Sequence, residues 1–167
     1  DEYKQPLKHL VGVEVGVKRG NNAGLLLKNL NLKKLYLVDP WVAYVDQISS
    51  KEIRDGKLSE NFFKEVQEKF SKNDNVEIIR DFSVNAAKTF EDNLCDFVYI
   101  DGDHSYENVL NDLNAWYPKL KQYGVMCGDD YGHPSGVGVI KAVAEFVKNK
   151  SLIVHYGEDD QFWFVKV

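Results

Sequence analysis

The apolar residues of this chain follow two periods that take turns along its length. Short runs rich in Val, Ile, Leu and Tyr are typical of buried strands, and stretches with apolar residues at every third or fourth position are typical of helices packed on one side. Strands that alternate with helices in this way predict a parallel sheet with helices on its faces. The predicted strands are Leu10–Val17, Lys34–Pro40, Val76–Arg80, Phe97–Ile100 and Gly124–Gly128.

Five helical stretches follow these strands. One of them begins after the irregular segment Val42–Leu58, with Ser59 as its expected N-cap. Pro118 is expected to end the helix after the fourth strand, because proline disrupts a helix interior. The predicted helices are Asn22–Leu30, Ser59–Phe70, Val84–Phe90, the stretch up to Tyr117 that carries Val109, Leu113 and Trp116 on one face, and Val137–Val147.

The C-terminal end breaks this alternation. Leu152–Tyr156 and Phe162–Val167 are both strand-like, and only Gly157–Gln161 joins them. Such a short connection cannot hold a parallel crossover, so the two strands must pair antiparallel. The predicted fold is therefore α/β, a Rossmann-like doubly wound sheet of seven strands, mostly parallel with a C-terminal antiparallel β-hairpin. A length of 167 residues fits a single domain spanning 1–167.

Composition narrows the class of protein. The chain is 44% hydrophobic and 28% charged, which is ordinary for a globular domain, and its net charge of -5 gives no broad cationic surface for nucleic acid. No apolar run reaches the roughly 18 residues that suggest a membrane span, and no N-terminal signal pattern is present. Cys95 and Cys127 lie in strand-like stretches and are expected to be free, buried thiols. We therefore expect a cytoplasmic protein that binds neither nucleic acid nor membranes.

Acidic residues stand at the carboxyl end of every predicted parallel strand. In doubly wound sheets, ligands bind at this edge, where the strand order reverses. Like charges crowded there cost stability unless ligand hydroxyls, an ammonium group or a metal ion compensates them. The pattern predicts a ligand site among Glu14, Asp39, Asp81, Asp101, Asp129 and Asp130.

The turn after the first strand carries Gly16 and Gly20, which let the backbone come close to a ligand. Its spacing differs from the G-x-G-x-x-G cradle of dinucleotide enzymes. Asp39, at the end of the second strand, is placed to accept hydrogen bonds from both hydroxyls of a ribose, as in dinucleotide and S-adenosylmethionine sites. The terminal hairpin favours the second kind of site, because a plain dinucleotide fold has no need of it.

The sequence resembles class I S-adenosylmethionine-dependent methyltransferases in four motifs, VEVGVKRG, LYLVDPW, DFVYIDGDHSYENVLNDLNAWYPKL and YGVMCGDDY. Within that class it is similar to the small-molecule O-methyltransferase group of the Methyltransferase 24 type, with its macrolide-sugar and cephalosporin-hydroxylase-like members. The resemblance runs from Leu10 to Val167 and implies transfer of a methyl group to an oxygen of a small-molecule acceptor. Three features depart from the family: Lys18 replaces the middle glycine, Asp129 stands where histidine is frequent, and most of the N-terminal substrate-binding extension is missing.

The resemblance implies a set of cofactor contacts. The methionine moiety would lie near the first turn, the ribose at the end of the second strand, the adenine after the third strand and the sulfonium after the fourth. The implied residues are Glu14, Gly16 and Gly20 for the turn, Asp39 for the ribose, Trp41 against the adenine or a substrate, Asp81, Phe82 and Ser83 for the adenine border, and Asp101 for the sulfonium region.

It also implies a divalent-metal site, for Mg²⁺, formed by Asp101, Asp129 and Asp130, in which the ion would activate the acceptor hydroxyl. A second interpretation stays open, in which Asp101 contacts the cofactor, Asp129 is solvated and Asp130 caps a turn. In both cases the acceptor must lose a proton, and His104 or His133 is the candidate base, with Asp101 beside them in the catalytic set. His104 follows a strand end, so it also fits a structural role at a helix start.

The substrate pocket is predicted to form from Val42–Leu58 and Tyr131–Gly138, which carry flat apolar side chains. A second subunit could complete its lid, which leaves a homo-oligomer open. Two other functions stay open as well. One is a non-catalytic S-adenosylmethionine-binding domain without an acceptor site, and the other is a nicotinamide-dependent dehydrogenase, which the glycine spacing disfavours.

Overall fold

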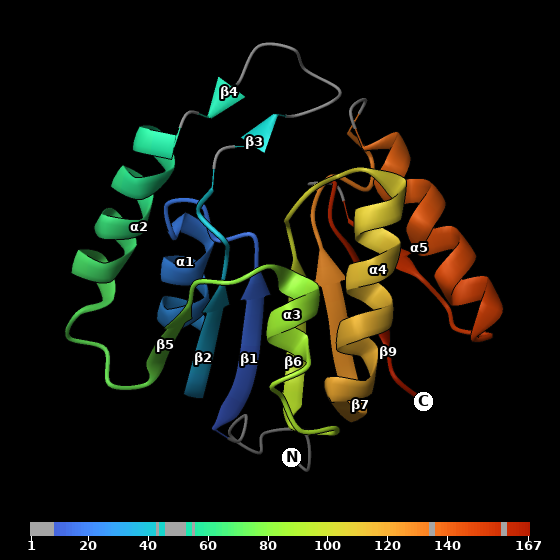
Figure 1. Cartoon of the computed structure of the whole chain (residues 1–167). Coiled ribbons are helices and arrows are strands. Elements are labelled where there is room, and N and C mark those ends of the chain that lie inside the picture. Colours follow the sequence, from blue (N-terminus) through green and yellow to red (C-terminus); the bar gives the residue numbers. More distant parts are fainter. Residues whose placement is uncertain (1–8, 43, 46–52, 55, 134–135, 158–159) are drawn as a thin grey trace.

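A seven-stranded sheet forms the centre of the molecule (Figure 1). The computed structural model describes residues 9–42, 44–45, 53–54, 56–133, 136–157 and 160–167. The strand order is β5 (Val76–Ile79), β2 (Leu32–Val38), β1 (Leu10–Val15), β6 (Cys95–Ile100), β7 (Leu120–Gly128), β9 (Phe162–Val165) and β8 (His155–Tyr156). The first five are parallel, and β9 pairs antiparallel with both β7 and β8. The predicted doubly wound sheet with its C-terminal hairpin is confirmed.

Helices cover both faces of this sheet. The chain moves from β1 to β2 and β5 in one direction and from β6 to β7 in the other, and right-handed crossovers then place the connecting helices on opposite faces. Accordingly, one buried cluster joins the sheet to α1 and α2, and another joins it to α3, α4 and α5 (Figure 1). The helices are α1 (Asn21–Asn29), α2 (Gly56–Phe70), α3 (Ser83–Ala87), α4 (Tyr106–Trp116) and α5 (Val137–Asn149).

The strand order reverses between β1 and β6, and the chain is held tightly there. The backbone N–H of Gly16 donates to Val38 O at 2.9 Å, and that of Asp101 donates to Val15 O at 2.8 Å. Gly16 has a φ of 88°, and a Cβ at this position would lie 2.0 Å from Asp101 O. Only glycine fits both the backbone angle and the close approach, so three strand ends can meet at one point.

Several element boundaries differ from the predictions. Helix α2 begins at Gly56, so Ser59 lies inside the helix and the prediction that it is the N-cap is wrong. The buried Ser59 hydroxyl donates to Val42 O at 2.8 Å. Strand β7 begins at Leu120, because Leu120 pairs with Cys95 before the register shifts and pairing resumes at Val125. A short antiparallel ribbon of β3 (Tyr44–Val45) and β4 (Ile53–Arg54) was not predicted. The prediction for Pro118 is confirmed, because α4 ends at Trp116 and Pro118 follows in a 3-10 turn, η1 (Tyr117–Lys119).

The thiol prediction holds, since Cys95 and Cys127 are both free, with Cys95 fully buried in β6 and Cys127 partly buried in β7. The other two histidines lie away from the cavity: His9 is exposed, and His155 is exposed on edge strand β8 with its ring stacked on Trp163. Among the described residues, no helix is both long enough and apolar enough to span a membrane.

Candidate active site

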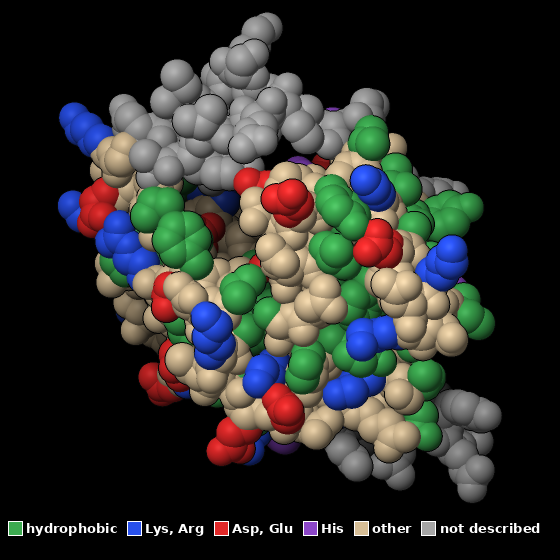
Figure 2. Space-filling view, turned by 45° about the vertical axis from the view of Figure 1, so that its right-hand side comes forward, with side chains coloured by type: hydrophobic (Ala, Val, Ile, Leu, Met, Phe, Trp, Pro, Cys, Tyr) green, Lys and Arg blue, Asp and Glu red, His purple; other side chains and the backbone are tan. Residues whose placement is uncertain are grey.

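A cavity of about 560 Å³ opens at the carboxyl ends of β1, β2 and β6, where the strand order reverses. This volume is in the range of small-molecule sites. Figure 2 shows the surface hollowed on this side of the molecule. The walls of the cavity come from both halves of the sheet and from three helices. The residues that line it include Gly16, Lys18, Asp39, Trp41, Val42, Ser59, Phe62, Phe82, Ser83, Asp101, His104, Asn108, Asp112 and Asp130.

Asp39 is fixed at one wall of the cavity by the backbone around it. One carboxylate oxygen accepts the N–H of Lys18 at 2.9 Å, and the other accepts the N–H of Trp41 at 2.7 Å. The residue is 8% exposed and lines the cavity. A carboxylate oxygen has more than one acceptor position, so both oxygens keep capacity for a ligand. This is the arrangement that the predicted ribose contact requires.

Two hydrogen bonds hold Lys18, the non-glycine residue in the middle of the glycine turn. Lys18 has a φ of 53°, a left-handed conformation that favours glycine, the residue that the resemblance leads us to expect at this position. Its N–H goes to Asp39, and its carbonyl accepts the indole N–H of Trp41 at 2.9 Å. Trp41 is buried, packs against Phe63 and also lines the cavity, so it fixes the turn on the side that faces α2.

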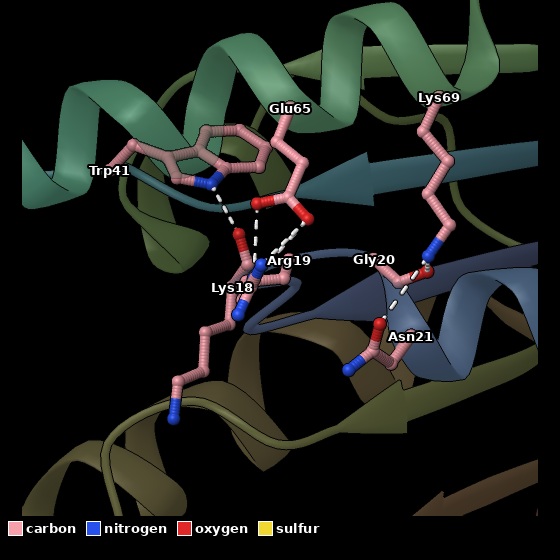
Figure 3. Close-up of polar contacts among 7 residues, drawn as sticks. All are labelled: Lys18, Arg19, Gly20, Asn21, Trp41, Glu65 and Lys69. Atoms are coloured by element: carbon pink, nitrogen blue, oxygen red, sulfur yellow. Dashed lines mark hydrogen bonds and ion pairs between the residues drawn. The ribbon is translucent and has the colours of Figure 1, made fainter.

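Helix α2 holds the turn from outside, as Figure 3 shows. Glu65 forms a two-pronged pair with Arg19, at 3.0 Å from each donor nitrogen, and Lys69 donates to Gly20 O at 2.7 Å. Gly20 has a φ of 68° and abuts the ring of Phe70, but it does not line the cavity. Its function in the structure is to start α1, where it is the N-cap residue.

Glu14 lies at the end of β1 and is 1% exposed. Burial, then the charges of Asp101 and Asp39, raise its pKa to about 8, while Asn22 and Lys69 act in the opposite direction. Its Oε2 has no hydrogen-bond partner within the described part of the chain. A buried acceptor without a partner is costly, and the ammonium group of an amino-acid moiety would supply the missing donor. Glu14 is not among the residues that line the cavity, so its contact to methionine stays a prediction.

The predicted adenine border lies around the start of α3. Phe82 is 58% exposed and lines the cavity with Ser83, whereas Asp81 does not line it. The Asp81 carboxylate accepts the backbone N–H of Phe82 at 2.7 Å. An exposed phenyl ring at the wall of a cavity is a suitable contact for a flat base.

Three polar side chains meet at the opposite wall. The Nε2 atom of His104 lies 3.1 Å from Asp130 Oδ2 and 3.5 Å from Asp101 Oδ1. The hydrogen bond with Asp101, together with the charges of Asp130, Asp101 and Asp103, raises the pKa of His104 against the effect of burial. One ligand atom from each of Asp101, His104 and Asp130 lies within 4.8 Å of the others, which is close enough for one metal ion.

The predicted metal set is therefore brought together only in part. The Asp129 carboxylate accepts the N–H of Asp130 at 2.9 Å and lies outside the group of three, whose third member is His104. Asp130 has a φ of 62°, so the chain has turned and the two acids point differently. Burial, and then the charge of Asp101, raises the pKa of Asp129 despite that hydrogen bond. His133 Nδ1 lies 3.8 Å from Asp130 Oδ1, and His133 does not line the cavity.

Sequence reasoning missed two polar residues on α4. Asn108 and Asp112 both line the cavity, one helical turn apart, and Asp112 is 6% exposed. Their spacing of four residues was the available signal, because residues i and i+4 share a helix face. The apolar stripe of Val109, Leu113 and Trp116 beside them identified the helix but not this polar edge.

The two segments predicted to form the substrate pocket contribute unequally. Among their described residues Val42 lines the cavity, and the described part of Tyr131–Gly138 does not. Tyr131 instead packs against Tyr156 and Phe162. Residues 43, 46–52, 55 and 134–135 lie outside the described residues.

Comparisons with known proteins agree with this geometry. A family model described as a methyltransferase domain matches residues 13–131. An uncharacterized protein of Acanthamoeba polyphaga mimivirus is 30% identical over 127 residues, which cover 73% of this chain and 52% of that protein. The chain thus spans about half the length of this curated relative.

Solved structures share the fold at low identity. The O-methyltransferase NovP has a TM-score of 0.65 and 20% identity, covering 95% of this chain and 72% of its own. A protein of Streptococcus mutans described as a methyltransferase, solved with S-adenosylhomocysteine, has a TM-score of 0.63 and 15% identity over 96% of this chain and 90% of its own. Spermidine synthase from Thermotoga maritima has a TM-score of 0.63 and 15% identity over 96% of this chain and 55% of its own.

At these identities the solved structures establish only the fold. The family model covers most of the chain and establishes the family. The chain belongs to the methyltransferase-domain family, and its fold is that of class I S-adenosylmethionine-dependent methyltransferases.

Proposed function

We propose that this chain binds S-adenosylmethionine in the cavity and transfers its methyl group to an oxygen of a small-molecule acceptor. The observation that carries the proposal is the Asp39 carboxylate, fixed by two backbone N–H groups on the cavity wall with acceptor capacity left for two ribose hydroxyls. Glu14 would take the ammonium of the methionine moiety, and Phe82 would lie against the adenine. S-adenosylmethionine itself supplies an electrophilic methyl group on a sulfonium.

The chain's own task is then alignment and removal of a proton. Methyl transfer is an in-line displacement: the acceptor oxygen bonds to the methyl carbon as the carbon–sulfur bond breaks, and the acceptor's proton goes to a base. His104, held between Asp101 and Asp130, is the base we propose. Its raised pKa means that it becomes neutral, and able to accept a proton, only towards higher pH.

A divalent cation held by Asp101, His104 and Asp130 is the alternative for the same step. Their separations of 3.1 and 3.5 Å are near the edge of about 3 Å expected for an octahedron with metal–ligand bonds of about 2.1 Å. The mixed nitrogen and oxygen donor set suits Mn²⁺ or Fe²⁺ better than Mg²⁺, which prefers oxygen ligands. An ion there would stabilise the deprotonated acceptor oxygen.

A small acceptor is supported by the cavity volume and by the net charge of -5. The crowding of Asp101, Asp130 and His104 favours a catalytic site over a binding domain that has lost its acceptor site, because such crowding has a cost that catalysis would explain. The absence of the dinucleotide glycine pattern favours S-adenosylmethionine over NAD.

Titration calorimetry tests the proposal. The wild type should bind S-adenosylmethionine and S-adenosylhomocysteine, and Asp39→Ala should weaken both by roughly 1–3 kcal/mol, because hydrogen bonds to a charged acceptor are lost. Asp92→Asn, in an exposed ion pair with Lys119, is the control for charge alone. Unchanged affinity in Asp39→Ala, or tighter binding of NAD, would contradict the assignment.

A further inference from the structure

The edge strand β8 leaves one side of the central sheet open. Within the described part of the chain, β8 is the last strand and pairs only with β9. The Gly157 N–H donates to Gln161 O at 2.9 Å, and bonded and non-bonded pairs alternate along an antiparallel ladder, so the backbone groups of Tyr156 point away from the sheet. Burial alternates over residues 152–155, so the chain is already extended there and Val154 also presents its backbone groups at this edge.

The side chains along this edge are exposed and carry no fixed charge. Ile153 is 74% exposed and Tyr156 is 72% exposed. No Lys, Arg, Asp, Glu or Pro occurs in the sequence 151–157. The strand at the opposite edge of the sheet, β5, carries Glu77 in an ion pair with Lys34. Charged residues and proline are the usual protection of an edge strand against pairing with another chain, so β5 has such protection and β8 lacks it.

Opposite charges flank this edge. Lys148 and Lys150 precede it and are exposed, and Asp160 follows it in the turn to β9. Lys150 and Asp160 are equally far from His155 along the chain. The Lys150 ammonium lies over the ring of Tyr117, and among the described residues none of the three flanking charges forms an ion pair. An antiparallel copy of the same edge would bring its acidic end to this basic end, whereas a parallel copy would bring like charges together.

We propose that β8 is a self-association edge, at which a second copy of this chain pairs antiparallel about a two-fold axis at His155. In this register Val154 of each copy exchanges both of its outward backbone hydrogen bonds with Tyr156 of the other copy. Ile153 then lies over Gly157 of the second copy, where no side chain obstructs it. The two sheets join into one, and the free edge disappears. Because this axis is perpendicular to the sheet, the two cavities open at opposite ends and stay accessible.

Analytical ultracentrifugation of the whole chain over a range of concentrations tests the proposal. A short edge contact is a small interface, so we expect a reversible dimer with a Kd of roughly 1–100 µM that weakens as salt screens the charged ends. Ile153→Lys places a charge at the joint between the copies and should raise the Kd by roughly 10-fold or more. Tyr156→Pro should also raise it, because it removes an N–H that points out of the sheet and takes no bond from the hairpin.

Val167→Lys is the matched control, because Val167 is 76% exposed and lies beyond the end of β9, and it should leave the Kd as it is. A wild type that stays monomeric up to about 1 mM overturns the proposal. A dimer that Ile153→Lys leaves intact overturns it too, because that dimer uses another surface, and so does an equal weakening by Ile153→Lys and Val167→Lys, which would reflect net charge alone. Ile153 has an exposed side chain, so Ile153→Lys decides the matter should Tyr156→Pro not fold.

Discussion

The two ends of the cavity are built on opposite principles. At the glycine turn, two charged groups are paired with the backbone: Asp39 accepts two N–H groups, and Lys69 donates to Gly20 O. At the other end, the His104 imidazole lies between the carboxylates of Asp101 and Asp130. Asp129 precedes Asp130 in the chain and adds a third carboxylate. The first end is preorganised around Asp39, whereas the second lowers its own energy by gaining a proton or a cation.

This contrast assigns the two ends different tasks. A rigid end suits a cofactor that binds in the same way in every cycle, and a charge-crowded end suits a step in which a proton moves. The variants below perturb one end or the other.

The largest effect is expected at Gly16. A Cβ in Gly16→Ala would lie 2.0 Å from Asp101 O at a φ of 88°, so two strand ends must separate. We expect the free energy of unfolding to fall by about 3 kcal/mol or more, in the range of severe overpacking. Gly24→Ala in α1 is the control, since its Cβ would meet only Lys69 at 3.8 Å and alanine favours a helix by about 0.5–1 kcal/mol. Equal stability of the two variants by chemical denaturation would show that the turn is not rigid.

Glu14→Gln should stabilise the ligand-free protein and weaken its binding of the cofactor. The folded pKa of about 8 lies above the ordinary carboxyl pKa of 4.5, so ionisation opposes folding increasingly from pH 4.5 up to pH 8. We expect a gain of roughly 2–3 kcal/mol at pH 7 and almost none at pH 4.5. Exposed Glu68→Gln on α2 is the control. A loss of stability at pH 7 would mean that Glu14 has a partner in the free protein.

The crowded end should respond through His104. Its pKa is raised, so its contribution to stability is complete at low pH and is lost as the pH rises through the folded pKa. His104→Gln should therefore lower the melting temperature more at pH 5 than at pH 9. In nuclear magnetic resonance titrations, the pKa of His104 should fall in both Asp101→Asn and Asp130→Asn, because each removes a carboxylate that favours the imidazolium. A His104 pKa that stays the same in both variants would show that neither carboxylate interacts with the imidazole.

The smallest effect is expected for the outer support of the turn. Lys69→Met keeps the apolar stem but loses the bond to Gly20 O, for which we expect a cost of about 1 kcal/mol in stability. Lys72→Met, on an exposed lysine beyond the end of α2, is the control. If Lys69→Met lowers stability as much as Gly16→Ala, the turn depends on α2 rather than on its own backbone.

The fold was predictable because its signals are periodic. Strands such as Lys34–Pro40 and the short link Gly157–Gln161 identify the parallel sheet and its hairpin from local pattern alone. The start of α2 was not predictable in this way, because Ser59 is a good N-cap by residue type, whereas in the structure it is buried inside the helix and donates to Val42 O. The two-residue strands β3 and β4 are too short to show a period.

The positions of the site residues along the chain were predictable, but the directions in which their side chains point were not. The acids Glu14, Asp39 and Asp101 lie where strand ends must meet. Which of Asp129 and Asp130 joins His104 depends on one backbone angle, the φ of 62° at Asp130, and a sequence does not specify it. Asp112 was missed because its burial follows from how α4 packs on its neighbours rather than from its own pattern.

The account's central claim is that cofactor binding belongs to the glycine-turn end and not to the acidic end. Calorimetric titration of S-adenosylhomocysteine into Asp39→Asn and Asp130→Asn, two variants that each lose one negative charge from the same cavity, tests it most directly. We predict that affinity falls by roughly 10-fold or more in Asp39→Asn and changes by less than about 3-fold in Asp130→Asn. The reverse order, or an equal loss in both variants, would contradict the division of the cavity into two ends.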